Sequence, residues 1–185
     1  DTQVFRFSCE LYKTVNKDLL QKATEDTLEE FDIFKSILRR GLFWYYLEES
    51  DIKPIVREEY KIPCSLIYQR NNHKLLFEVT YYRNRINLEV FHVLTDGTGA
   101  MNFLKTLVSN YLTLAENVED SGVDYDASST QKSDDSFSKY YSGKISSKQE
   151  NNPVAYKIVG RKYPDDKLKV INGMVDVKKV LEESH

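Results

Sequence analysis

Residues 75–112 read LLFEVTYYRNRINLEVFHVLTDGTGAMNFLKTLVSNYL, and this stretch decides the fold that we expect. Two β-rich runs, 75–82 and 85–91, are separated by only two residues, a spacing typical of a β-hairpin. From 102 to 115 the large apolar residues recur at helical spacing, which predicts a helix with one buried face. The sequence therefore predicts a strand–turn–helix unit centred on residues 92–99.

The segment before this unit contains further predicted elements. Residues 4–12 alternate between polar and apolar side chains, which predicts a strand with one apolar face. Asn16 is a good N-cap for a helix over 17–31, and 33–40 is expected to add a helical turn that ends at Gly41.

The run LFWYYL at 42–47 is apolar throughout and too short for most helices, so we expect a buried strand that packs in the core. Lining of an acyl or acceptor pocket is the alternative role for this run. The polar residues 48–63, with two prolines, predict an irregular excursion, and 64–69 predict a short strand.

Composition changes after residue 116. Residues 117–152 are rich in Ser, Asp, Lys, Asn and Gln, which predicts a mobile linker or a long surface loop. Strands are expected at 154–159 and 168–175, and a helix at 176–183. We therefore expect an N-terminal lobe over 1–116, a linker over 117–152, and the start of a second lobe over 153–185.

Composition also limits the classes of function. The 185 residues are 41% hydrophobic with a formal net charge of −3, so global charge favours neither nucleic acid nor an anionic membrane as a partner, although local patches remain open. Cys9 and Cys64 lie far apart and are expected to be free thiols in the cytoplasm. No apolar run is long enough to span a membrane, and no metal-ligand spacing or Gly-rich phosphate loop occurs.

The turn at 91–99, FHVLTDGTG, carries the pattern His-x-x-x-Asp-Gly. It resembles the signature of the chloramphenicol acetyltransferase-like superfamily, which includes alcohol acetyltransferases and condensation domains of nonribosomal peptide synthetases. The likeness is greatest to bacterial members of the alcohol acetyltransferase type, although Phe91 stands where the family usually has a first histidine. The resemblance implies an α/β fold, one lobe of that architecture, with a mixed β-sheet flanked by helices.

The resemblance also implies an activity, the transfer of an acyl group, acetyl from acetyl-coenzyme A, to an alcohol or amine acceptor. His92 would be the general base, because a neutral imidazole with a pKa near its usual value of about 6.5 accepts a proton at neutral pH. By the same resemblance Asp96 has a structural role and pairs with an arginine, for which Arg39 is the candidate and Arg40 the rival. Gly97 would permit tight backbone geometry where a side chain would intrude.

Alternatives remain at each of these residues. His92 alone would be an ordinary histidine at a strand end, and Arg39 alone would be a solvated residue at a helix C-terminus. His73 and His185 are expected to be surface residues. A catalytically degenerate binding module, or an enzyme that uses a carrier-protein thioester, is the alternative to transfer from coenzyme A.

The resemblance finally implies partners. The family's histidine faces a tunnel between two lobes, whereas this chain starts at Asp1 rather than Met and its last expected helix lies at its end. We therefore expect the 185 residues to be part of a longer enzyme, to need a second lobe for activity, and to expose an apolar face that favours self-association.

Overall fold

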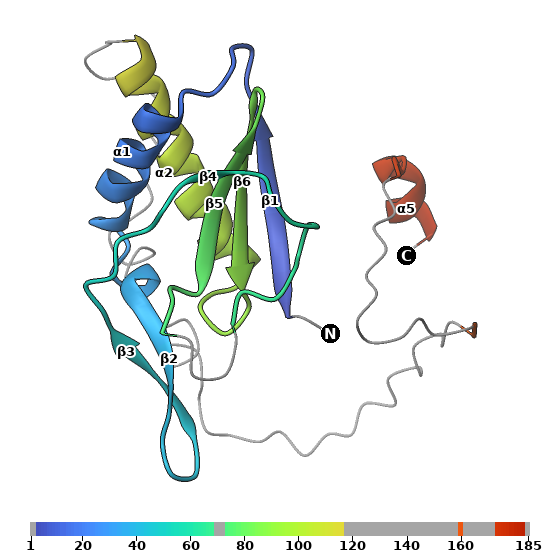
Figure 1. Cartoon of the computed structure of the whole chain (residues 1–185). Coiled ribbons are helices and arrows are strands. Elements are labelled where there is room, and N and C mark those ends of the chain that lie inside the picture. Colours follow the sequence, from blue (N-terminus) through green and yellow to red (C-terminus); the bar gives the residue numbers. More distant parts are fainter. Residues whose placement is uncertain (1–2, 69–72, 117–158, 161–172, 184–185) are drawn as a thin grey trace. The chain divides into compact units, whose positions relative to one another are not determined.

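The computed structural model of the chain describes residues 3–68, 73–116, 159–160 and 173–183 (Figure 1). The chain divides into two compact units, Asp1–Ser142 and Gly143–His185, which are described separately. The predicted linker at 117–152, and most residues of the strands expected at 154–159 and 168–175, lie outside the described residues. No helix among the described residues has the length and apolar character that crossing a membrane requires.

The first unit contains a four-stranded mixed sheet in the order β1-β6-β5-β4 and a separate two-stranded sheet formed by β2 and β3. Its elements, in chain order, are β1 Val4–Glu10, α1 Lys17–Leu28, the 3-10 helix η1 Asp32–Lys35, β2 Ser36–Arg40, β3 Tyr45–Glu49, β4 Arg57–Glu58, β5 Phe77–Tyr82, β6 Arg85–Phe91 and α2 Gly97–Glu116. The predicted α/β class, with a mixed sheet flanked by helices, is confirmed.

The strand–turn–helix unit predicted around residues 92–99 is present. β5 and β6 form an antiparallel hairpin in which Tyr82 pairs with Arg85, and β1 pairs antiparallel with the other edge of β6. The helix α1 begins as expected after Asn16, whose side-chain oxygen accepts hydrogen bonds from the backbone N–H groups of Asp18 and Leu19.

The core lies between the sheet and the two helices, which Figure 1 shows together on one face of the sheet. Phe34 and Phe103 stack with ring centroids 4.1 Å apart, and the edges of Phe31 and Phe77 contact the Phe103 ring at 5.3 Å each. These aromatic residues connect η1, β5 and α2, while Leu20 from α1 is fully buried in the same cluster.

Two predictions in the segment 33–47 are wrong. Only residues 32–35 are helical, and Ser36–Arg40 is a strand that pairs antiparallel with β3. The run 42–47 is not a buried strand, because residues 42 and 43 form the turn of the β2–β3 hairpin and their side chains are 84% and 83% exposed. The Gly41 N–H donates to the Trp44 carbonyl at 2.7 Å and closes this turn.

The strand predicted at 64–69 is also absent over its described residues, 64–68. Cys64 has a φ of 59°, in the left-handed region, which turns the chain instead of extending it. In the second unit, α5 Val177–Glu183 confirms the helix predicted at the end of the chain, and the Asp176 carboxylate accepts a hydrogen bond from the Lys178 N–H.

Candidate functional site

His92 occupies the first position after β6. Its backbone N–H donates to the Gln3 carbonyl at 2.8 Å, which extends the pairing between β1 and β6 by one step. The Leu94 N–H then donates to the Phe91 carbonyl at 2.9 Å, so the chain turns immediately after the histidine and enters α2 at Gly97. The backbone position of His92 is therefore determined by both its neighbouring strand and the following turn.

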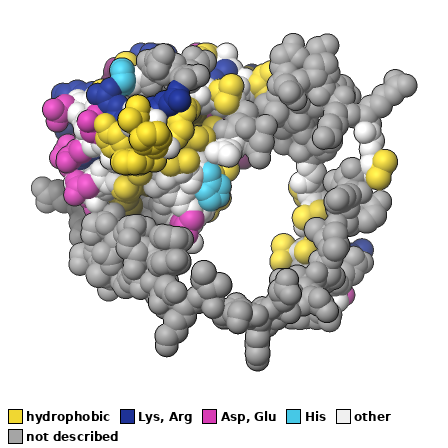
Figure 2. Space-filling model, turned by 90° about the horizontal axis from the view of Figure 1, so that it is seen from below, with side chains coloured by type: hydrophobic (Ala, Val, Ile, Leu, Met, Phe, Trp, Pro, Cys, Tyr) yellow, Lys and Arg dark blue, Asp and Glu magenta, His cyan; other side chains and the backbone are white. Residues whose placement is uncertain are grey.

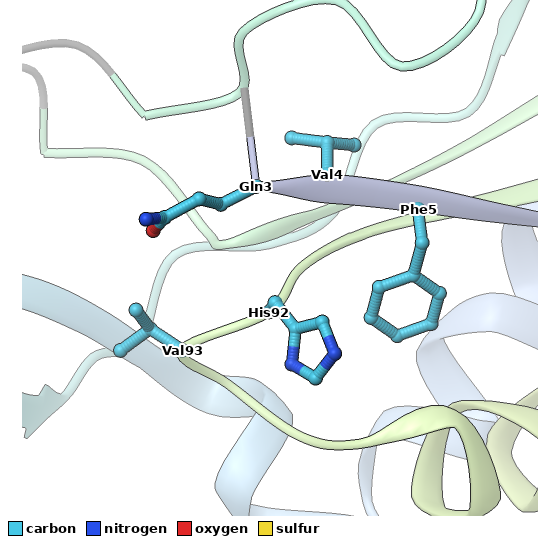
Figure 3. A pocket seen from close by; sticks show the side chains of 5 residues that line it. All are labelled: Gln3, Val4, Phe5, His92 and Val93. Atoms are coloured by element: carbon cyan, nitrogen blue, oxygen red, sulfur yellow. The ribbon is translucent and has the colours of Figure 1, made fainter. Parts of the chain in front are cut away.

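The His92 side chain lies in an open pocket of about 490 Å³ (Figure 3). The other lining residues are Gln3, which precedes β1, Val4 and Phe5 at the start of β1, and Val93. The imidazole meets the Phe5 ring at a centroid distance of 5.1 Å and an interplanar angle of 61°. Among the described residues no side chain forms a hydrogen bond with the ring of His92, so its nitrogens are available to a ligand.

Asp96 caps α2. Its carboxylate oxygen accepts a hydrogen bond from the Gly99 N–H at 2.9 Å, and its carbonyl accepts one from the Ala100 N–H at 3.1 Å. An acidic side chain at this place satisfies one free N–H group and interacts favourably with the positive end of the helix dipole. Asp96 thus orders the turn after His92 by capping the helix, and not by the expected ion pair with Arg39.

The predicted pair between Arg39 and Asp96 is not formed. Arg39 lies on β2, where its Nε atom contacts the Glu48 carboxylate at 2.5 Å and its guanidinium contacts the His73 ring. The reason is the β2–β3 pairing, which was not predicted and which brings Glu48 to the side of Arg39. The rival candidate, Arg40, is exposed and makes no ion pair among the described residues.

The close approach expected at Gly97 occurs at Gly99 instead. A methyl group at Gly97 would lie 3.8 Å from the Phe7 ring, an ordinary contact, whereas one at Gly99 would collide with the side chain of Thr95. The sequence Gly-Thr-Gly contains both residues, and only the geometry of the turn shows which of them needs to lack a side chain.

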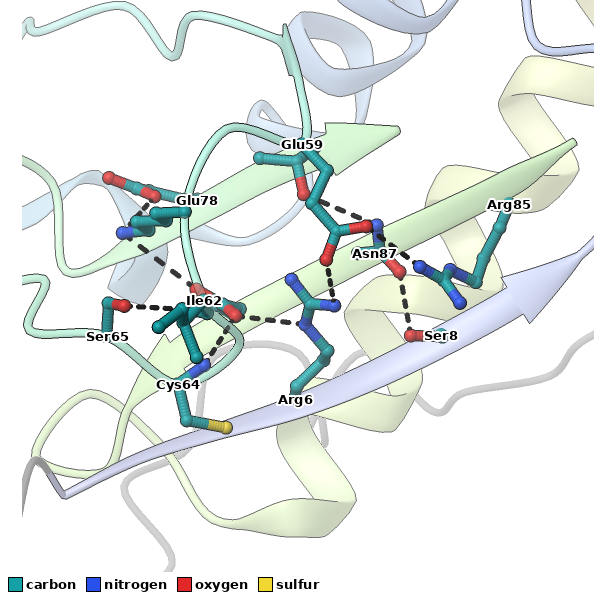
Figure 4. A network of polar contacts seen from close by, with 12 residues as sticks. Arg6, Ser8, Glu59, Ile62, Cys64, Ser65, Glu78, Arg85 and Asn87 are labelled. Atoms are coloured by element: carbon teal, nitrogen blue, oxygen red, sulfur yellow. Dashed lines mark hydrogen bonds and ion pairs between the residues drawn. The ribbon is translucent and has the colours of Figure 1, made fainter. Parts of the chain in front are cut away.

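Sequence reasoning missed a network of charged side chains on the face of the sheet opposite the helices (Figure 4). Glu89, only 1% exposed, accepts hydrogen bonds from Arg6 Nε at 2.9 Å and from the Cys64 backbone N–H at 2.8 Å. Arg6 also bonds Glu59 at 2.6 Å, and Arg85 bonds the other oxygen of Glu59 at 2.8 Å. The alternating pattern of β1 and β6 could have indicated this charged face, because Arg6, Arg85 and Glu89 all lie on the same face of their strands.

This network does not form a nucleophilic or metal site. Burial, followed by the nearby Glu89 charge, raises the pKa of the Cys64 thiol, and burial also raises the pKa of Cys9, so both thiols are protonated at neutral pH. Within the part of the chain that the structure describes, no group of three or more His, Cys, Asp and Glu side chains is placed to hold a metal ion.

Comparison with known proteins gives structural likeness only. No protein-family model matches the chain, and no curated protein sequence matches it. Among solved structures, the SgcC5 protein from Streptomyces globisporus matches with a TM-score of 0.47 and 11% identity over 62% of this chain and 31% of that protein. Polyketide synthase associated protein 5 from Mycobacterium tuberculosis matches with a TM-score of 0.47 and 18% identity over 62% of this chain and 30% of its own.

A third match is VibH, described as a condensation enzyme of nonribosomal peptide synthesis, with a TM-score of 0.45 and 16% identity over 63% of this chain and 31% of VibH. The chain therefore spans about a third of the length of these proteins.

Proposed function

We propose that this chain carries the histidine side of an acyltransferase site, in which His92 is the general base for transfer of an acyl group from a coenzyme A thioester to an alcohol or amine. The observation that supports the proposal best is the position of His92, at the end of β6 with its imidazole in an open pocket. The acetyl group of acetyl-coenzyme A is the proposed acyl group.

The described residues support the proton transfers of such a reaction. A ring nitrogen of His92, which makes no hydrogen bond with a side chain of the described residues, accepts the proton of the acceptor O–H or N–H group. The acceptor atom then bonds to the thioester carbonyl carbon, the C–S bond breaks, and the imidazolium returns the proton to the leaving thiolate. No acyl-enzyme is required, in keeping with the protonated state of both thiols.

The proposed enzyme also needs a second wall for this pocket. The lining residues come from Gln3 and the first positions of β1, and from the turn after β6, which together form one side of an open site. Reactants must be held in attack geometry, and such positioning contributes about 7 to 11 kcal/mol of the barrier reduction. We propose that a second lobe, outside residues 1–116, supplies the opposite side.

The alternative is a catalytically degenerate module that binds a partner without chemistry. One observation favours it: Phe91, which stands where the family usually has a histidine, is buried and stacks on Tyr68 at a centroid distance of 5.8 Å. A carrier-protein thioester in place of free coenzyme A is compatible with the same pocket.

The test is His92→Ala, assayed by release of free thiol from acetyl-coenzyme A with a panel of alcohols and amines. We expect turnover to fall at least about a hundredfold, the low end for loss of a general base. His73→Ala is the matched control, because His73 is exposed and contacts Arg39 instead of the pocket. The assay uses a longer product that contains this chain, because the described lining residues supply only one side of the proposed pocket. Retention of most activity by His92→Ala would remove this residue from the mechanism, and absence of thiol release with every acceptor would favour the module.

A further inference from the structure

The tip of the β2–β3 hairpin exposes an unusual run of apolar side chains. Leu42, Phe43 and Trp44 are 84%, 83% and 66% exposed, and Tyr45 and Tyr46 are 53% and 45% exposed. We call these five residues the aromatic tip. Figure 1 shows that the hairpin projects beyond the end of the four-stranded sheet. A contiguous exposed patch of this kind marks an interaction surface.

The fold makes the aromatic tip a stable feature of the surface. Ile37, near the start of β2, is buried in the core, and Leu38 and Leu47 pack against that core from the two strands. The Gly41–Trp44 hydrogen bond closes the turn, so these side chains are presented outward by an anchored hairpin.

Positive charge accompanies the aromatic tip. Arg40 precedes the turn, pairs across the hairpin with Tyr45, and makes no ion pair among the described residues. The acidic residues of the hairpin, Glu48 and Glu49, lie at the far end of β3, and Glu48 is already engaged by Arg39. Figure 2, seen from the hairpin end, shows hydrophobic side chains gathered on this surface, with Lys and Arg side chains along one edge and Asp and Glu side chains along another.

We propose that the aromatic tip inserts into the interfacial region of an anionic lipid bilayer. Trp and Tyr favour this region because their rings are apolar while the indole N–H and phenol O–H still reach water and headgroups. Leu42 and Phe43, at the extreme of the turn, reach the acyl boundary. The guanidinium of Arg40, which makes no ion pair with a described residue, binds headgroup phosphates. Attraction of one arginine to an anionic surface and insertion of a few side chains give weak, reversible, salt-sensitive binding.

The shape of the aromatic tip favours a bilayer over a second copy of the chain. A stable protein interface involves about 20–30 residues on each side and needs a matching concave or flat surface. A projecting two-residue turn offers a few convex side chains, which a fluid bilayer accommodates without shape complementarity. The overall charge of −3 is no obstacle, because the attraction acts over about one Debye length, near 8 Å in physiological salt.

The chain contains a built-in probe for this proposal, since Trp44 is its single tryptophan. The experiment adds vesicles of phosphatidylcholine, with or without phosphatidylserine, to the 185-residue chain and records tryptophan emission. We expect a shift to shorter wavelength that is larger with phosphatidylserine, decreases with salt, and is accompanied by quenching from brominated acyl chains.

Two pairs of variants sharpen the test. Leu42→Ser should lower vesicle partitioning about tenfold, because it removes an apolar side chain that would be inserted in the bilayer. Leu66→Ser, at an exposed leucine outside the hairpin, should leave partitioning unchanged. Arg40→Gln should lower partitioning about fivefold on anionic vesicles only, and Arg57→Gln, at an exposed arginine of β4, should not. Circular dichroism of each variant verifies that it is folded.

Three results would overturn the proposal. The first is emission that no vesicle shifts. The second is a shift without lipid that grows with protein concentration, which would mean that a second copy covers the aromatic tip. The third is an equal loss of partitioning in Leu42→Ser and Leu66→Ser, which would place the membrane contact elsewhere. None of these results depends on acyltransferase activity.

Discussion

The two faces of β6 are equally buried but chemically opposite. Ile86, Leu88 and Val90 are fully buried beneath the helices, whereas Asn87 and Glu89, at most 1% exposed, point to the other face beneath the segment around residues 59–65. On the first face, burial of apolar surface contributes about 25 cal/mol per Å². On the second face, ion pairs and hydrogen bonds must offset the desolvation of charges, so this face determines the path of the covering loop more than it adds stability.

The largest effect is expected on the apolar face. Phe103 is fully buried and contacts three other phenylalanine rings. Phe103→Ala should lower the free energy of unfolding by about 3–5 kcal/mol, because it removes buried surface and leaves a cavity. Urea denaturation followed by circular dichroism measures it. A loss below about 1 kcal/mol would show that the helices do not pack on the sheet as described.

Much of the apolar face could be predicted from sequence, because its signals are local. The two strands of the β5–β6 hairpin, the cap at Asn16 and the helical spacing in α2 each lie within a few residues of one another. The same reasoning failed for β2, since Ser36–Arg40 shows no clear alternation and becomes a strand only through pairing with β3. The prediction of a buried strand failed for residues 42–46 because a short aromatic run looks the same in sequence whether it lies in an exposed turn or in the core.

In the candidate site too, the features set by local sequence could be predicted, and those set by tertiary contacts could not. The placement of His92 after a strand and before a helix follows from local pattern and is present in the structure. The partner of Arg39 could not be predicted, because Glu48 reaches it through an unexpected hairpin. The charged network was missed for a related reason: residues 59–63 were expected to be irregular, and only the tertiary structure places them, together with Cys64, over the polar face of β1 and β6.

The charged face should respond more weakly, and in a way that depends on the side chain chosen. Glu89→Ala should cost about 3 kcal/mol, because it removes the carboxylate that accepts bonds from Arg6 and the Cys64 N–H. Glu89→Gln is the matched control, since its amide oxygen still accepts both bonds and should recover part of the loss. Equal losses for the two variants in urea denaturation would mean that charge, and not the acceptor geometry, holds the loop.

The smallest effect is expected from pH and concerns Glu59, the carboxylate shared by Arg6 and Arg85. Partial burial alone would raise the pKa of Glu59, but the hydrogen bonds and charges of Arg6 and then Arg85 outweigh it and lower the pKa.

A carboxylate with a lowered folded-state pKa stabilises the protein above its unfolded pKa, about 4.3 for Glu, and this stabilisation is lost as the pH falls through the folded value. Urea midpoints of the chain should therefore decrease between pH 6 and the acid range on the order of pH 3. Glu59→Gln, which cannot titrate, should start lower at pH 6 and show a shallower decrease. Ile86, Leu88, Val90 and Phe103 carry no ionisable group, so Phe103→Ala should keep the slope of the unsubstituted chain. Identical slopes for Glu59→Gln and the unsubstituted chain would show that Glu59 is not paired in solution, and the contrast between the two faces of β6 would then rest on Glu89 alone.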